Sequence, residues 1–238
     1  VLSWQNTALK IPEALLFMDA DMQVGKGFLG GLQRTMQSSG AHAVSGMPKL
    51  ICKSFWEALL VPAIAALAAS LYPPSGLKQK GFLNGQVILI RTSALAQVGG
   101  WSSVEHEVLE DVALAQRLVK AGFSIRLVDF QSACATRMYT NLTEIINGFA
   151  KNYVALTEST SRGMGIALLG VALSSAPWLY CFTALALQAR LELPFIALGL
   201  VTLFQGLTRQ AWGQPVWPVL FVPLTALGVL RIAVKSRF

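Results

Sequence analysis

The sequence predicts an α/β domain with a mostly parallel sheet, followed by C-terminal transmembrane helices. Residues 1–160 alternate apolar, strand-like runs with helical segments, which is typical of sheets whose strands are joined by helices. In residues 161–238, long uncharged runs replace this alternation. The 238-residue chain is 54% hydrophobic and only 13% charged, whereas soluble domains carry about 25% charged residues. We therefore expect an α/β domain over 1–160 and a membrane domain over 161–238.

Each element expected in the first part has a local signal. Residues 13–19 (EALLFMD) form a continuous apolar run, as in a strand buried on both faces. Residues 110–122 carry an apolar stripe at helical spacing and end at Gly122, a common helix stop. The other expected elements are a helix over 28–40, a strand over 41–50, a strand passing into a helix over 85–99, and a strand over 123–129.

Apolar runs after residue 160 predict two or three membrane spans. Residues 163–187 hold no charge and are long enough to cross about 30 Å of hydrocarbon. Residues 193–207 are short for a span, and 216–234 are adequate. The alternative, a buried hairpin in a large soluble core, is disfavoured by the length of these runs. A further apolar stretch, 55–72, contains a glutamate and a proline, and we expect an amphipathic or interfacial helix there.

The positions of basic residues bear on orientation. Lys151 and Arg162 precede the first span, which places the α/β domain on the cytoplasmic side of a multi-pass cell-membrane protein. Arg231, Lys235 and Arg237 would also prefer the cytoplasm. Three spans would place them outside, so either the middle segment is re-entrant or the positive-inside rule fails, and the sequence leaves this open.

Net charge and cysteine usage narrow the classes of partner. The formal net charge is +7, but the basic residues are scattered beside apolar spans. Contact with anionic lipid and with an anionic substrate explains them better than nucleic acid does. The three cysteines form no CxxC pair, which indicates reduced thiols. The chain opens at Val1 with no signal-peptide pattern, and it reads as if it began in the middle of a fold.

Two carboxylates follow the first predicted strand. Asp19 and Asp21 are separated by one residue, so on an extended chain their side chains point the same way. Ligands of open parallel sheets bind beyond the carboxyl ends of the strands. Mg²⁺ and Mn²⁺ commonly sit between one or two carboxylates and substrate phosphates. A lone D-x-D is common in surface loops, but the buried run before it favours a divalent-metal site here.

A second acidic pair lies at the start of a predicted helix. Glu110 and Asp111 stand in its first turn, where acidic residues complement the helix dipole. The same carboxylate can also take the proton of an acceptor hydroxyl, which would make Asp111 a general base. Both interpretations can hold together. His106 is a candidate ligand or base, although an ordinary loop histidine is the simpler interpretation.

An arginine precedes the next helical pattern. Arg137 follows a polar stretch, and its forked guanidinium could hold the diphosphate of a leaving group. The alternative is an arginine at the protein surface or beside lipid head groups.

Five segments in this order resemble family 2 glycosyltransferases: LLFMDAD, GFLNGQVILIRTSALAQVGGW, LEDVALAQRLVKAGFSIRLVD, TRMY and GFAKN. Within that family they most resemble membrane enzymes that glycosylate polyisoprenoid-type lipids, such as hopanoid-associated and carotenoid glycosyltransferases. Ceramide glucosyltransferases are more distant. The resemblance covers roughly residues 10 to 155. It implies a bacterial source and a chain that is the C-terminal part of a longer protein, without the half that recognises the donor's base.

The resemblance also implies a partial GT-A fold and residue roles. Asp19 and Asp21 match the family's D-x-D, with Asp21 the expected direct metal ligand and Asp19 near the donor diphosphate. Asp111, beside Glu110, matches the catalytic base, and Arg137 matches the arginine of Q-x-x-R-W. The segment that borders acceptor and sugar supplies three more positions: Asn84, Gly85 and Trp101. Trp101 would pack on the sugar or in the core.

The function implied is inverting, metal-dependent transfer of a sugar from a nucleoside-diphosphate donor to a membrane lipid. The resemblance departs at the last motif, because Cys134 replaces its glutamine, and Met138 and Tyr139 follow Arg137 in place of tryptophan. In the resembled family, the full motif accompanies polymer synthesis, so its loss favours a single transfer. Two alternatives remain: a processive polysaccharide synthase and a non-catalytic membrane subunit.

Overall fold

The computed structural model describes residues 11–72 and 81–237, which fall into two compact units. The first, here the sheet unit, comprises Val1–Pro48 and Pro74–Cys134. The second, the helical unit, comprises Lys49–Pro73 and Ala135–Phe238. The predicted boundary at residue 160 follows composition, whereas these units follow contacts, which group residues 49–73 and 135–160 with the apolar helices.

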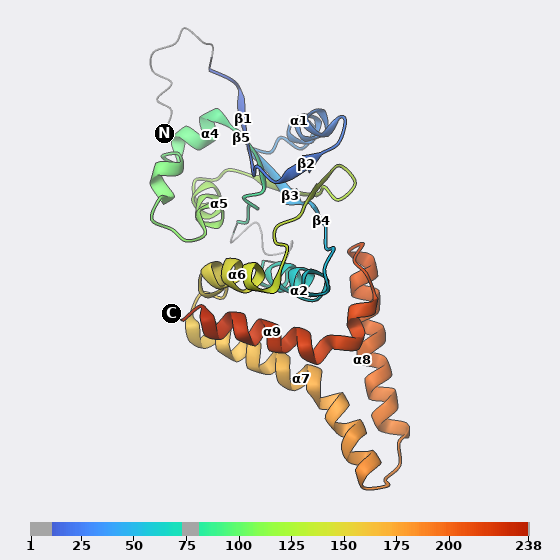
Figure 1. The fold of residues 1–238 in the computed structure, drawn as a ribbon. Coiled ribbons are helices and arrows are strands. Elements are labelled where there is room, and N and C mark those ends of the chain that lie inside the picture. Colours follow the sequence, from blue (N-terminus) through green and yellow to red (C-terminus); the bar gives the residue numbers. More distant parts are fainter. Residues whose placement is uncertain (1–10, 73–80, 238) are drawn as a thin grey trace. The chain divides into compact units, whose positions relative to one another are not determined.

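A four-stranded sheet forms the centre of the sheet unit (Figure 1). Its order is β1 (Ala14–Met18), β5 (Val87–Arg91), β3 (Ala43–Met47) and β6 (Ile125–Asp129). Strand β3 pairs in parallel with β6, but β5 pairs antiparallel with both β1 and β3. Three strands therefore share one direction and β5 opposes them.

The predicted mostly parallel sheet thus needs correction, since two of its three pairings are antiparallel. Parallel neighbours require a crossover connection, usually a helix packed on the sheet. The helix that follows β3 in the chain, α2 (Phe55–Leu71), belongs to the helical unit instead. When the chain returns to the sheet unit, β5 pairs in the reverse direction with β1 and β3.

Helices cover both faces of the sheet, so the side chains of its central strands are mostly apolar. Side chains of β5 alternate between the faces. Val87 and Leu89 pack with α1 (Phe28–Ser39), and Ile88 and Ile90 pack with α5 (Glu110–Lys120). These burial patterns confirm the predicted helices near 28–40 and 110–122. Shorter elements complete the described part of the unit: β2 (Met22–Val24), α4 (Thr92–Gln97) and the 3₁₀ helix η3 (Trp101–Val104).

The helical unit begins with β4 (Lys49–Leu50), which pairs in parallel with β7 (Cys134–Thr136). Helices α2 and α6 pack with α7 (Thr160–Ala186) and α9 (Val222–Lys235) around Ile64, Ile146 and Ile232. In chain order, the elements after β7 are α6 (Leu142–Leu156), α7 (Thr160–Ala186), α8 (Glu192–Ala211), the 3₁₀ helix η4 (Trp217–Phe221) and α9 (Val222–Lys235).

Helix α2 differs from the amphipathic, interfacial helix expected over 55–72. It is apolar on all sides, and nearly all of the segment Glu57–Ile64 is buried. Helices with no polar face are stable when other elements surround them, and here α6 and α9 pack against α2. Ser54 and Glu57 begin the helix with a reciprocal capping box, in which each side chain accepts a hydrogen bond from the other's backbone N–H.

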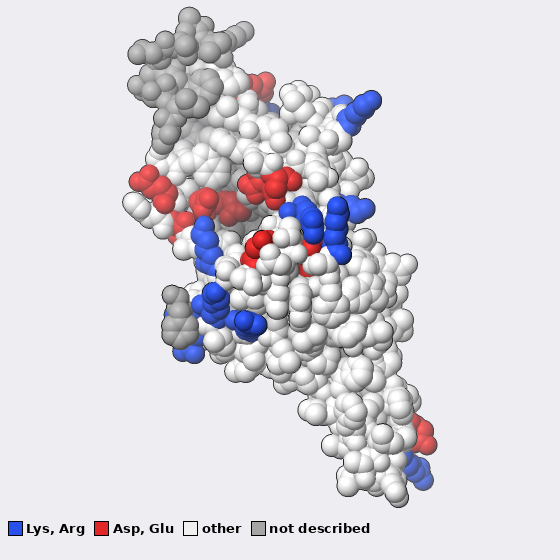
Figure 2. Space-filling view, in the orientation of Figure 1, with Lys and Arg blue, Asp and Glu red and all other residues white. Residues whose placement is uncertain are grey.

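Two helical segments of the described chain are long and apolar enough to cross a membrane, Thr160–Ala186 and Trp217–Lys235. Large apolar side chains of α7 are exposed, with Leu173 at 64% and Phe182 at 64%. Helix α8 also exposes apolar residues, including Phe204. Figure 2 shows the α7–α8 surface without charge except at its far end. An apolar surface of this extent supports membrane association.

Gly46, in β3, lies opposite Val128 of β6. A Cβ added to it would lie 1.8 Å from the Val128 carbonyl oxygen and 2.9 Å from the Phe130 ring. Gly31, in α1, has no atom within 4 Å of the equivalent position.

We predict that Gly46→Ala destabilises the full chain, whereas Gly31→Ala does not. Steric overlap against backbone should cost about 1–3 kcal/mol or more. In Gly31→Ala, alanine's higher helix propensity should stabilise the helix by up to about 1 kcal/mol. Thermal unfolding in detergent, followed by circular dichroism, measures both. Equal melting temperatures for the two variants would contradict the close packing at Gly46.

Candidate active site

The carboxyl edge of the sheet, where β1 and β3 end, carries the first predicted site residues. Strand β5 starts at this edge because it runs in reverse, so Met18 pairs with Val87. The backbone N–H of Asp19 donates to the Gln86 carbonyl at 3.2 Å. Asp19 and Asp21 then occupy the turn between β1 and β2, closed by the Met22 N–H on the Asp19 carbonyl. Both aspartates are exposed at this edge.

Asn84 fixes the loop that enters β5. Its amide nitrogen donates to the Gly46 carbonyl at 3.0 Å and to Gln86 Oε1 at 3.2 Å. Its backbone N–H donates to the hydroxyl of Ser45, a fully buried residue, at 2.9 Å. Residues 84–86 are thus held against the ends of β1 and β3.

Asp111 reaches the same loop from the first turn of α5. Its Oδ2 accepts the backbone N–H of Gly85 at 2.7 Å, and its Oδ1 accepts that of Val112 at 2.8 Å. A Cβ on Gly85 would lie 3.2 Å from Oδ2, so glycine permits this close approach. Burial raises the pKa of Asp111 above its ordinary value; the two N–H donors oppose the rise, and the charge of Glu110 adds to it.

Negative charge accumulates around the turn that holds Asp19. Partial burial, followed by the charges of Asp21 and Glu110, raises the pKa of Asp19. The charge of Glu110, from the first turn of α5, thus acts on Asp19 at the end of β1. Like charges held together in this way favour a bound cation. The described residues contain no cluster of three or more His, Cys, Asp or Glu side chains that could hold a metal alone.

Trp101 lies in the sheet unit, at the border of its core. Its ring makes an edge-to-face contact with Phe17 on β1, with centroids 5.2 Å apart. The side chain packs against the same apolar cluster as α5. This is the core packing that the sequence allowed, and a role in contacting sugar stays a prediction.

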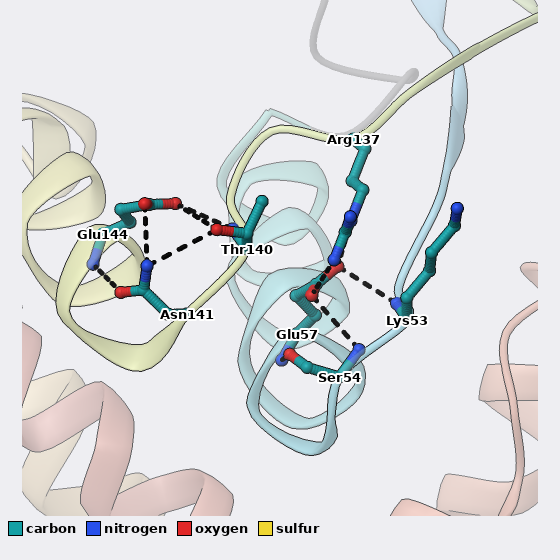
Figure 3. A network of polar contacts seen from close by, with 7 residues as sticks. All are labelled: Lys53, Ser54, Glu57, Arg137, Thr140, Asn141 and Glu144. Atoms are coloured by element: carbon teal, nitrogen blue, oxygen red, sulfur yellow. Dashed lines mark hydrogen bonds and ion pairs between the residues drawn. The ribbon is translucent and has the colours of Figure 1, made fainter.

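Arg137 belongs to the helical unit, where it makes a forked ion pair with Glu57 (Figure 3). Its Nε donates to Oε2 at 3.0 Å and its Nη2 donates to Oε1 at 2.9 Å. Glu57 is fully buried and Arg137 is about one-third exposed, at 32%. The hydrogen bond from Arg137 lowers the pKa of Glu57 to about 2 despite its burial; backbone N–H groups of Lys53 and Ser54 act in the same direction.

Two polar residues of these networks were not singled out from the sequence. Ser45 is an inconspicuous serine in a predicted strand, and no local pattern marks it. Glu57 was noted only as a charge in an apolar run. The motif SFWE at 54–57 matches the capping-box pattern and could have identified the start of α2, although nothing local joins it to Arg137.

The sheet unit therefore carries Asp19, Asp21 and Asp111 on the loops at the carboxyl edge of its sheet, the edge at which α/β folds bind ligands. Residues 12–216 match glycosyl transferase family 21, and the chain belongs to this family. No curated protein matches the chain. Family membership supports transferase activity.

This match agrees with the expected glycosyltransferase class. The matched family is family 21, however, whereas the sequence motifs resemble family 2. The match does not extend to the GT-A fold, to the metal or to a hopanoid or carotenoid acceptor. Those parts of the expectation, and the roles of the site residues, remain predictions.

We predict that Glu57→Gln destabilises the protein by about 1–3 kcal/mol near neutral pH, because a fully buried side chain loses its charge-assisted hydrogen bonds to Arg137. Glu13→Gln removes an exposed carboxylate that pairs with Arg91, and exposed pairs contribute about 0–1 kcal/mol. Thermal unfolding in detergent compares the two variants. Similar losses of stability in the two variants would contradict the larger contribution expected from the buried carboxylate of Glu57.

The same pair predicts how stability depends on pH. The folded pKa of Glu57 is about 2, below its ordinary value of 4.5. Its contribution is therefore present above pH 4.5 and is lost as the pH falls from 4.5 towards 2. The melting temperature of the wild type should fall more steeply than that of Glu57→Gln across this range. Parallel pH curves would contradict the assignment.

Proposed function

We propose that this protein transfers a sugar from a nucleoside-diphosphate donor to a hydroxyl of a membrane lipid, with inversion at the anomeric carbon. The observation that carries the proposal is the loop 84–86 at the carboxyl edge of the sheet, where the Gln86 carbonyl accepts the Asp19 N–H and the Gly85 N–H donates to Asp111. Membership of a glycosyltransferase family and the apolar helices of the second unit support it. A polyisoprenoid, hopanoid or carotenoid acceptor, a GT-A fold and kinship with family 2 are the finer parts of the proposal.

The acidic turn fits a divalent cation shared with donor phosphates. Asp21 would bind Mg²⁺ or Mn²⁺ directly, with Asp19 beside it, because hard cations prefer carboxylate oxygens. When bound, the metal would offset charge on the departing diphosphate. The charge that Asp21 and Glu110 place near Asp19 supports this assignment.

Asp111 would act as the general base. Its carboxylate is fixed by two backbone N–H groups, which orient it without neutralising it. A lipid hydroxyl approaching this carboxylate would lose its proton to it as the oxygen attacks the anomeric carbon. Attack from the face opposite the diphosphate inverts that carbon. Glu110, one residue earlier and exposed, would keep the local potential negative.

Arg137 would hold the diphosphate. A guanidinium carries five donors, so it can keep Glu57 and also bind an anionic group. Its forked contact with Glu57 fixes its orientation before the donor arrives, which is the geometry that bidentate recognition of phosphate requires. Asn84, Gly85 and Trp101 would border the acceptor and the sugar.

We also propose a multi-pass location in the cell membrane of a bacterium, with the sheet unit in the cytoplasm. The exposed apolar residues of α7 and α8 support this proposal, because burying them in lipid removes them from water. A membrane location would bring the lipid acceptor to the enzyme.

We predict that Asp111→Asn in the full-length protein lowers transfer by about 10²–10⁴-fold while preserving donor binding. Product formation from radiolabelled sugar nucleotide and membrane lipid measures transfer, and equilibrium dialysis measures binding. The wild-type rate should rise with pH through the pKa of Asp111, which burial places above its usual value. His106→Gln tests the other candidate base; loss of activity there, with an active Asp111→Asn, would reverse the assignment.

We predict that Asp21→Asn raises the Mn²⁺ concentration needed for half-maximal transfer by at least about tenfold. Asp129→Asn is the matched control, since Asp129 also ends a strand of this sheet but bonds only its own loop through the Gln131 N–H. Chelation with EDTA should stop the wild-type reaction. Activity that persists in EDTA would remove the metal from the proposal. Products longer than one sugar would instead favour a polysaccharide synthase. If the protein did not bind the donor, a non-catalytic subunit would be favoured.

A further inference from the structure

The helical unit contains a cavity of about 290 Å³ between α2, α7, α8 and α9. This volume is close to that of the smallest ligand sites, about 300 Å³. Small side chains on three of the helices leave the space open, among them Ala66, Gly170 and Ala226. The site residues discussed above do not line it.

Arg209 lies in the wall of the cavity, and its guanidinium bonds to α2 where Pro62 removes a helical hydrogen bond. Pro62 has no N–H, so the carbonyl of Ala58 lacks its usual helical donor. Arg209, from α8, supplies one: its Nη1 donates to the Ala58 carbonyl at 2.9 Å, and its Nη2 to that of Leu59 at 3.4 Å. The guanidinium is therefore fixed at the cavity by the backbone of α2.

The cavity is polar at one end and apolar along its length. Arg209 and Gln214 mark the polar end, where Gln214 Nε2 donates to the Leu50 carbonyl at 3.4 Å. Ala66 lies eight residues beyond Ala58, which is about 12 Å along a helix. At that distance the lining is apolar, with Leu67, Ala167 and Val229.

The polar end lies at the same end of α2 as the Glu57–Arg137 pair. Glu57 immediately precedes Ala58 in the helix. Cys52 also experiences this group of charges: burial, followed by the charge of Glu57, raises its pKa to about 11, and the charges of Arg209 and Arg137 oppose the rise. A polar group held by Arg209 would therefore lie in the neighbourhood of Arg137.

We infer that this cavity binds the alkyl chain of a long-chain membrane lipid along its apolar lining, with a polar group of that lipid at Arg209. The inference rests on the proposed function and names the binding site of its lipid acceptor. The mostly apolar lining and the small volume suit an alkyl chain better than a sugar nucleotide, and the apolar, exposed surface of α7 would give lipid access from a bilayer.

The test uses a long-chain alcohol with a diazirine in its alkyl chain, added to the full chain in phosphatidylcholine nanodiscs. Photolabelling should saturate, and peptides from 62–67 and 222–229 should carry the label. Gly170→Leu fills the cavity and should weaken saturable labelling by at least about tenfold. Gly199→Leu is the matched control, because Gly199 is an exposed α8 glycine with open space around it and does not line the cavity.

Ala226→Leu repeats the test from α9, in case Gly170→Leu impairs folding, and thermal unfolding checks both variants. Equal saturable labelling of the wild type, a folded cavity variant and Gly199→Leu would overturn the inference, as would label confined to outward-facing residues. No sugar donor or metal is present, so the result is independent of transfer. Failed transfer with retained, saturable labelling would reject the proposed function and leave the lipid site intact.

Discussion

Strand β5 runs against its two neighbours, and the arrangement of the candidate site depends on this reversal. A parallel strand in the same place would start at the opposite edge of the sheet and carry residues 84–86 there. Running in reverse, β5 begins where β1 and β3 end. The loop before it thereby meets Asp19 through the Gln86 carbonyl and Asp111 through the Gly85 N–H. Apolar side chains of α1 and α5 pack on the two faces of β5 and keep the strand in this position.

The two units use charge differently. In the sheet unit, Asp21 and Glu110 place like charge near Asp19, and such repulsion is relieved when a cation binds. In the helical unit, Glu57 and Arg137 neutralise each other, and Arg209 is satisfied by backbone carbonyls. The first arrangement suits a site that receives a ligand, and the second suits a scaffold that positions one.

Local signals allowed much of the secondary structure to be predicted, but not its pairing. The run LLFM and the stripe of 110–122 each carry their own period, so β1 and α5 could be recognised. Strand direction depends on where the preceding helix packs, and residues 55–72 are compatible with either an interfacial or a buried helix until their neighbours are known. The acidic residues were identified because they stand at element ends. Their grouping with Gly85, and the Glu57–Arg137 pair across 80 positions, follow from tertiary contacts that no local pattern encodes.

The β1–β5 register has a consequence for how this chain can change over evolutionary time. Side chains alternate between faces, so a slip of one residue would turn Phe17 away from the core and shift the aspartates relative to Gln86. Gain or loss of a single residue in 81–86 would force either that slip or a bulge. The connection between α7 and α8 meets no such demand, because it is exposed and joins two helices. Among homologous chains, insertions and deletions should therefore be common in the connection between α7 and α8 and rare in residues 81–86, which lead into β5.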